Sequence, residues 1–167
     1  MNTQLYTFKK IFDSHLEVGE GDKKESLHIR QIEIPRIQRD YAQGRETADV
    51  KKVRARFLGA LKKALATNCS LTLDFVYGDV EGTALVPLDG QQRLTTLFLL
   101  HWYAVRKCSV DFEEYEFLSR FSYSVRFSAR DFCKALVKNI MDVEDGCISE
   151  QLKDKAWFPM EWKNDPT

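Results

Sequence analysis

The sequence has few of the side chains from which metal centres and disulfide frameworks are built. Its cysteines lie far apart and never form a CxxC pair, and its histidines are equally scattered. Structural zinc sites and disulfide scaffolds need these residues at close and regular spacing. We therefore expect reduced thiols, a cytoplasmic location and no pre-spaced metal site. The residues concerned are Cys69, Cys108, Cys133, Cys147, His15, His28 and His101.

A net charge and a long apolar run are missing as well. Lys and Arg together number 25, as do Asp and Glu, so no global field draws the protein to nucleic acid or to an anionic membrane. No apolar run approaches the roughly 20 residues that span a bilayer. The first residues, Met1–Gln4, lack the basic-then-apolar pattern of a signal peptide. We expect no membrane association.

Charge is nevertheless uneven along the chain. Bases outnumber acids between residues 30 and 63, whereas the charged residues within 142–154 are mostly acidic. Such asymmetry indicates either a face for an anionic ligand or an ordinary solvated helix surface, and both interpretations stay open. The bases are Arg30, Arg36, Arg39, Arg45, Lys51, Lys52, Arg54, Arg56, Lys62 and Lys63.

The first half of the chain predicts two helices and a strand. With 167 residues, 44% of them hydrophobic, the chain suffices for one core, and we expect a single domain over residues 1–167. Apolar spacing predicts a helix over Leu5–Leu16, and alternation predicts a strand over His28–Ile34, followed by a loop over residues 36–44. A second helix should begin near Thr47, with a buried stripe formed by Val50, Val53, Phe57, Leu61, Ala64 and Leu65.

The second half predicts a hairpin, a core helix, a strand and a last helix. Strands over Leu71–Tyr77 and Thr83–Leu88 should be joined by residues 78–82. The helix from Gln91 to Lys107 is apolar almost all round, which is typical of a core position. Phe121–Phe127 predicts a further strand, and Ser128 is a candidate N-cap for a helix that ends at Lys138. The expected fold is α+β, a small mixed sheet packed with several helices.

The most informative stretch runs from Leu88 to Leu97 and reads LDGQQRLTTL. It lies between the predicted strand and the predicted core helix. The free N–H groups in the first turn of a helix point outward, and the helix dipole favours negative charge there. Arg93 adds a planar fork of donors that suits phosphate. The stretch therefore predicts an anion site, with a nucleotide phosphate as the first candidate.

Two motifs together resemble a known family. Ile34–Tyr41 reads IPRIQRDY, and DGQQRLTTL follows some fifty residues later; in that order they resemble the N-terminal domain of the GmrSD-type modification-dependent restriction proteins. The segment Phe121–Phe132 also looks like a pattern of this family. The resemblance covers roughly residues 8–167. It implies a ParB/sulfiredoxin-like fold, in which a strand, a turn and a helix hold nucleotide phosphates.

The same resemblance implies a setting for the domain. It implies nucleoside triphosphate binding, and hydrolysis in some relatives, coupled to DNA restriction in phage defence. Family proteins continue through a helical region, and some carry an HNH-like nuclease. No HNH signature is present in these residues, so no nuclease chemistry is assigned to them, and we expect an N-terminal fragment of a longer protein. We expect DNA to bind through that longer protein. Whether the domain forms a homo-oligomer stays open.

The candidate site residues have distinct expected roles. Gly90 would let the backbone approach a phosphate without a Cβ in the way. Arg93, with Arg39 on the opposite side, would neutralise phosphate charge. Asp89 is the acid placed to hold Mg²⁺ or to orient an attacking water, which Gln91 or Gln92 would position. The remaining candidates for nucleotide binding are Thr95, Thr96, Gln38 and Tyr41.

Simpler interpretations of the same residues stay open. Asp89 would serve equally well as a helix N-cap, and Arg93 as its ion-pair partner. The hydroxyls of Thr95 and Thr96 often bond to their own backbone. Gln38 and Tyr41 would then pack a loop, and His101 would be a satisfied core histidine. Salt bridges are the expected role of Arg126 and Arg130.

The sequence therefore predicts a regulatory domain that binds a nucleoside triphosphate with Mg²⁺ in a DNA restriction protein, with hydrolysis in the full-length protein. One alternative is a DNA-binding module that uses the basic helix over residues 51–63. Another is a sensing or interaction domain whose pocket binds without hydrolysis. A steep loss of affinity with salt would favour the DNA-binding module, and binding without turnover would identify the sensing domain.

Overall fold

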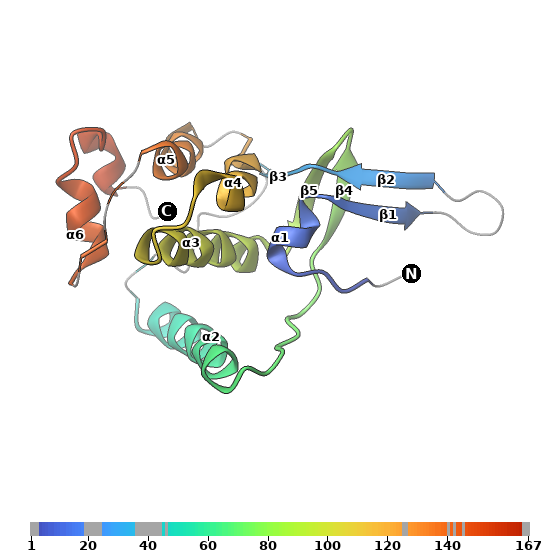
Figure 1. The fold of residues 1–167 in the computed structure, drawn as a ribbon, viewed down its shortest axis with the longest axis horizontal. Coiled ribbons are helices and arrows are strands. Elements are labelled where there is room, and N and C mark those ends of the chain that lie inside the picture. Colours follow the sequence, from blue (N-terminus) through green and yellow to red (C-terminus); the bar gives the residue numbers. More distant parts are fainter. Residues whose placement is uncertain are drawn as a thin grey trace.

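The fold is α+β, as the sequence predicts. The computed structural model describes residues 4–18, 25–35, 45, 47–124, 127–139, 141, 143–144 and 146–164. Within these residues the chain forms six α-helices, a two-stranded sheet and a four-stranded sheet. The core helix α3 (Gln91–Lys107) crosses the middle of the molecule in Figure 1, with α4 (Phe112–Tyr115) and α5 (Phe127–Lys138) on one side and α2 (Ala48–Thr67) on the other. None of these helices combines the length and apolar character that a bilayer span requires.

The four-stranded sheet is mixed and has the order β4-β5-β3-β6. Strand β3 (Gln31–Ile34) lies between two parallel neighbours, β5 (Ala84–Asp89) and β6 (Phe121–Tyr123). Strand β4 (Tyr77–Glu81) pairs antiparallel with β5 at one edge. Ile32 and Ile34 of β3 are buried while Gln31 is exposed, because successive residues of a strand face opposite sides of the sheet and the core covers one side.

One hydrophobic core joins this sheet to α3. Phe98 of α3 stacks on Phe121 of β6 with the ring centroids 4.7 Å apart, and Ile32 of β3 is fully buried in the same cluster. Farther along α3, the indole N–H of Trp102 donates to the carbonyl of Leu136 at the end of α5. The prediction that residues 91–107 form a core helix is confirmed, with the same bounds. Because α3 is anchored at several levels, its first turn is held firmly against the sheet.

The predicted N-terminal helix and the first predicted strand are corrected by the structure. Helix α1 spans only Phe8–Ile11, and Leu16 belongs to strand β1 (Ser14–Val18), which pairs with β2 (Glu25–Ile29). The Ser14 hydroxyl donates to the Ile11 carbonyl at the helix end. The predicted strand over residues 28–34 is two strands that break at residue 30, because β2 pairs with β1 whereas β3 joins the larger sheet. Apolar spacing alone did not distinguish these partners.

Helix α2 begins where the sequence predicts, but its apolar stripe is not buried. Thr47 occupies the N-cap position, without a hydrogen bond from its side chain. No residue of α2 is buried, and Leu65 in the predicted stripe is 74% exposed. The prediction of a buried stripe is therefore wrong for the described part of the chain. Amphipathic spacing creates an apolar face, but the element that covers such a face is set elsewhere in the sequence.

The predicted hairpin exists, but its strands are displaced. Residues 78–81, expected as the connection, lie in β4, and residues 71–76 form no strand. The chain reverses at Gly82 and Thr83, with a φ of +62° at Gly82, as suits a two-residue hairpin turn. A side chain at Gly78 would meet the Val86 carbonyl oxygen at 2.1 Å. Gly78 thus allows close pairing of β4 with β5.

The last predicted strand is shorter than expected, and the helix after it begins earlier. Strand β6 spans only Phe121–Tyr123, so the predicted extension to Phe127 is wrong. Helix α5 starts at Phe127, which places Ser128 inside the helix rather than at its N-cap. The remaining described elements are the short helices η2 (Glu116–Arg120), α6 (Ile148–Lys153) and η3 (Met160–Asn164). Helix α5 packs against β6 and η2.

Gly90, between β5 and α3, is required by both its backbone angle and its surroundings. Its φ is +89°, and a Cβ would lie 2.7 Å from a methyl group of Val76. We expect Gly90→Ala to lower the free energy of unfolding by about 2–4 kcal/mol, because it adds both backbone strain and a clash. Urea unfolding of the purified variant measures this.

Gly59→Ala is the matched control for that substitution. Gly59 lies inside α2, and no atom of the described residues lies within 4 Å of the place that a Cβ would take. The same added methyl group should therefore raise stability here by about 0.5–1 kcal/mol, because alanine favours the helix more than glycine does. Equal stability of the Gly90→Ala variant and the wild type would contradict the described turn.

Candidate functional site

The candidate site is the turn that connects β5 to α3. Strand β5 ends at Asp89, Gly90 takes the N-cap position in the left-handed conformation, and α3 begins at Gln91. The first helical hydrogen bond runs from the Leu94 N–H to the Gly90 carbonyl, at 2.9 Å. Glycine at the N-cap has no side chain with which to cap the helix. The predicted strand–turn–helix arrangement is therefore present, with Gly90 and Gln91 buried and the next two residues half-buried.

Arg93 is the centre of the polar contacts at this turn. Its Nη2 donates to the Asp89 carboxylate at 3.1 Å and to the carbonyl of Phe75. Its Nη1 lies 3.9 Å from the Asp74 carboxylate. The side chain is 23% exposed, and its Nε is buried with no hydrogen-bond partner among the described residues. The guanidinium is thus held at the protein surface between two carboxylates and a carbonyl.

These contacts decide between two of the interpretations of Asp89. The N-cap of α3 is Gly90, so Asp89 does not cap the helix. Asp89 instead pairs with Arg93 one helical turn later, as the ion-pair interpretation expects. Both carboxylates near Arg93 are exposed, so such a pair adds little to stability. The pair can therefore exchange for contacts with a ligand at small cost to the fold.

The two glutamines of the motif occupy different positions. Gln91 is buried, and its Nε2 donates to the carbonyls of Pro87 and Leu88, at 2.7 and 3.3 Å. These bonds tie the end of β5 to the start of α3. Gln92 is only half-buried. Of the two side chains, Gln92 is the more accessible to a ligand at the turn.

The two threonines face the interior of the domain. Thr95 is buried, and its hydroxyl is 2.9 Å from the hydroxyl of Tyr123 on β6. Thr96 is also buried, and its hydroxyl donates to the Gln92 carbonyl at 2.8 Å. The backbone bond of Thr96 is the one its residue type favours in a helix. Both hydroxyls make protein contacts in this structure.

Other residues singled out in the sequence lie elsewhere or outside the described residues. Gln38, Arg39, Tyr41 and Arg126 fall outside the described residues. The ring Nδ1 of His101 lies 2.8 Å from the Leu97 carbonyl, and its ring packs on Phe8, as expected of a core histidine. The guanidinium of Arg130 bonds to Asp131 and lies over the ring of Phe127, as expected of a salt-bridge residue.

The structure adds a segment that the sequence did not reveal. Residues 74–77 lie against the turn: Asp74 and the Phe75 carbonyl contact Arg93, and Val76 packs where a Cβ of Gly90 would be. Tyr77 is the antiparallel register partner of Asp89. No spacing in the sequence indicates these contacts, because they arise from the pairing of β4 with β5. The acidic side chain of Asp74 was the one feature of this segment that could have indicated a partner for Arg93.

The charges at the turn favour a cation together with an anion. Asp74 and Asp89 contribute two negative charges and Arg93 one positive charge, so a bare phosphate would meet net repulsion from these three groups. Mg²⁺ prefers carboxylate oxygens and is commonly held by one or two carboxylates plus the phosphates of a substrate. The described residues contain no group of three or more metal-ligating side chains. The two carboxylates would suit a metal ion that also binds phosphate.

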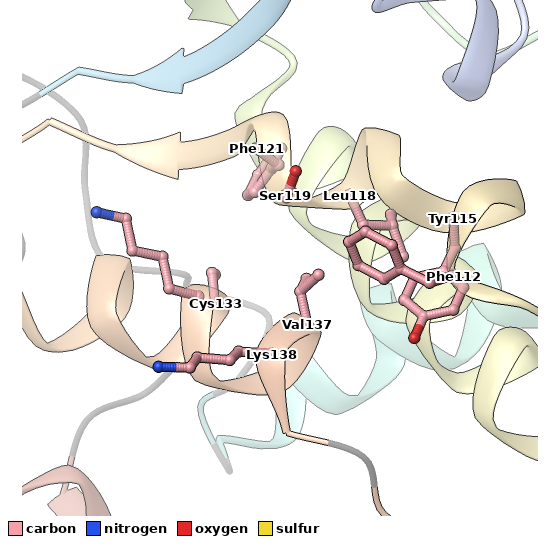
Figure 2. A pocket seen from close by; sticks show the side chains of 9 residues that line it. Phe112, Tyr115, Leu118, Ser119, Phe121, Cys133, Val137 and Lys138 are labelled. Carbon is pink, nitrogen blue, oxygen red and sulfur yellow. The ribbon is translucent and has the colours of Figure 1, made fainter.

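A separate cavity lies away from this turn (Figure 2). It encloses about 440 Å³ between α5 and the α4–η2 segment. Its walls are mainly apolar, and among the described residues only Lys134 and Lys138 bring charge to its lining. Its other lining residues are Phe112, Tyr115, Leu118, Ser119, Phe121, Cys133 and Val137. No residue of the Asp89–Arg93 turn lines it, so this cavity and the candidate site are separate.

Comparison with known proteins identifies a family. The family described as GmrSD restriction endonuclease, N-terminal domain, matches residues 21–159 of this chain. The match includes the β5–α3 turn and every contact of Arg93 described above. No curated protein and no solved structure matches the chain.

Proposed function

The chain belongs to the GmrSD restriction endonuclease N-terminal domain family, and from that premise we propose that its Asp89–Arg93 turn binds a nucleoside triphosphate together with Mg²⁺. The family makes the chain a domain of a DNA restriction system. In this proposal it is the regulatory domain, and nucleotide binding controls the DNA-cleaving part of the restriction protein. The related proposal of a ParB/sulfiredoxin-like fold is supported by the strand–turn–helix at the same place.

The observation that supports the proposal most is the arrangement around Arg93. A guanidinium held at the entrance to an uncapped helix N-terminus combines two features that bind phosphate. The two carboxylates beside it supply the oxygen ligands that a magnesium–phosphate complex needs. Val76 fills the space beside Gly90, so Gly90 supports the site by fixing the turn and not by admitting a phosphate to its backbone.

Each motif residue has a role in the proposal. Asp89 would hold the metal, directly or through water, and Arg93 would donate to the phosphates. Gln92, which is half-buried, positions the attacking water, while Gln91 holds the turn through its bonds to β5. Mg²⁺ would supply charge neutralisation and polarisation of the phosphate. The proposed nucleotide contacts of Arg39, Gln38 and Tyr41 rest on the sequence motifs. The hydroxyls of Thr95 and Thr96 are buried, and they would have to leave their protein partners to reach a nucleotide.

Arg93 provides the direct test of binding. A nucleoside triphosphate with Mg²⁺, present at about ten times its Kd, should raise the Tm of the wild type by about 3–6 °C. Arg93→Ala should abolish this shift and leave the protein folded, because it removes charge-assisted bonds and little core packing. Arg130→Ala, which removes a surface arginine paired with Asp131 on α5, is the matched control and should keep the shift. A wild type without any shift at millimolar nucleotide would count against the site.

Asp89 separates binding from chemistry. We expect Asp89→Asn to lower the rate of phosphate release by the complete restriction protein by roughly tenfold or more, while nucleotide affinity falls much less. The amide keeps the size of the side chain but lacks the negative charge that the metal needs. Phosphate release and equilibrium binding are measured in parallel. Equal losses in both would make Asp89 a positioning residue, and unchanged turnover would remove it from the reaction.

A specific observation also favours a second function, DNA binding through α2. None of its residues is buried, and it carries Lys51, Lys52, Arg54, Arg56, Lys62 and Lys63. If these side chains contact DNA phosphates, the logarithm of affinity should fall linearly with the logarithm of salt concentration. Replacing both Lys62 and Lys63 by Gln should reduce that slope by about 2, since each phosphate contact adds about 0.9. An unchanged slope would exclude these two lysines from the interface. A non-hydrolysing sensing domain would instead bind nucleotide without turnover.

A further inference from the structure

Two exposed aromatic side chains lie beside the proposed phosphate site. They are Phe75 and Tyr77, which we call the aromatic edge. Phe75 is 74% exposed and Tyr77 is 55% exposed. We propose that the aromatic edge stacks on the base of the nucleotide whose phosphates the Asp89–Arg93 turn holds. This inference rests on the proposed function, and it names the part of the site that distinguishes a nucleotide from a simple polyphosphate.

The contacts of the backbone place the aromatic edge at the turn. The carbonyl of Phe75 accepts a hydrogen bond from Arg93, so the backbone of Phe75 is in contact with the arginine that we propose binds phosphate. Val76, the residue between the two rings, packs against Gly90 and is half-buried. Tyr77 lies directly across from Asp89 in the antiparallel register of β4 and β5. The strand register shifts between Tyr77 and Gly78, and the pairing places Tyr77 next to Asp89 where the two strands meet the turn.

Phe75 is the most exposed aromatic residue in the described part of the chain, and Tyr77 is exposed by more than half. Full burial of a phenylalanine side chain is favourable, and eight aromatic residues of this chain are buried in the core. The residue between the rings is partly covered, so the segment itself is in contact with the protein. The rings are therefore the uncovered part of a segment that is otherwise held in place by Arg93, Gly90 and β5.

The chemistry of the surroundings favours a nucleobase as the occupant. A base presents a flat π face, and stacking of aromatic side chains on bases is a general mode of nucleotide binding. Two aromatic side chains offer roughly 300–500 Å² of surface, whereas a stable protein interface buries about 800 Å² on each partner. A nucleotide whose base stacks on the aromatic edge would also place its phosphates near Arg93. Stacking tolerates any base, so we expect ATP and GTP to bind with similar affinity.

The test compares a nucleotide with its phosphate chain alone. Binding of Mg-ATP and of magnesium tripolyphosphate is measured by calorimetry on the wild type and on a double variant, Phe75→Leu with Tyr77→Val. The substitutions keep apolar bulk and, at residue 77, strand preference, but remove the rings. We expect the Kd for ATP to rise about fivefold to a hundredfold and the Kd for tripolyphosphate to stay within about twofold. Phe112→Leu, which changes a 50% exposed phenylalanine on α4, is the matched control and should alter neither.

The outcomes separate this inference from the proposed function. If ATP binds the double variant as it binds the wild type, while Arg93→Ala still weakens both ligands, the aromatic edge does not contact the base and the inference is overturned. Equal losses for ATP and tripolyphosphate would also overturn it, because the rings would then support the turn. If unchanged ATP binding is accompanied by lost binding to the rest of the restriction protein, the aromatic edge is a protein interface. A wild type that binds neither ligand, or whose binding ignores Arg93→Ala, refutes the proposed function itself.

Discussion

The close approach of residues 74–76 to Gly90 and Arg93 is the contact on which the rest of the site depends. Because Gly90 has no side chain, Val76 packs directly on the turn, and Arg93 reaches both the Phe75 carbonyl and the Asp74 carboxylate. The same contact sets the place where β4 begins to pair with β5. Packing, strand register and the position of the guanidinium are thus consequences of one constraint. A ligand at this turn must replace the contacts of Asp89 without disturbing Val76.

Local signals in the sequence were sufficient to predict helix ends that are set by nearby residues. The bounds of α3 follow from Gly90 and a long apolar run, and the start of α2 follows from Thr47 and Asp49. Several errors concern the partners against which a segment pairs or packs, which apolar spacing does not specify. The spacing between residues 5 and 16 fits a helix, yet Leu16 pairs with Leu27 across a hairpin. The α2 stripe has helical spacing, but the described residues provide no surface that buries it.

Part of the candidate site could be predicted from the sequence, and part could not. The DGQQR motif predicts a turn between a strand and a core helix, and the structure has that turn; the ion pair between Asp89 and Arg93 also agrees with their separation of one helical turn. Asp74, Phe75 and Tyr77 were not predicted as neighbours of the turn, since only the pairing of β4 with β5 brings them there. A family resemblance named Arg39 and Tyr41, which lie outside the described residues.

In the proposed site, a magnesium–nucleotide complex replaces Asp89 as the partner of Arg93. A crystal structure of the protein with Mg²⁺ and a non-hydrolysable nucleoside triphosphate analogue is the sharpest test of this exchange. We expect phosphate oxygens within hydrogen-bond distance of the Arg93 guanidinium and of the first-turn N–H groups of α3, with the Asp89 carboxylate turned from Arg93 towards the metal. An analogue bound elsewhere, with the Asp89–Arg93 ion pair intact, would show that this turn is not the nucleotide site.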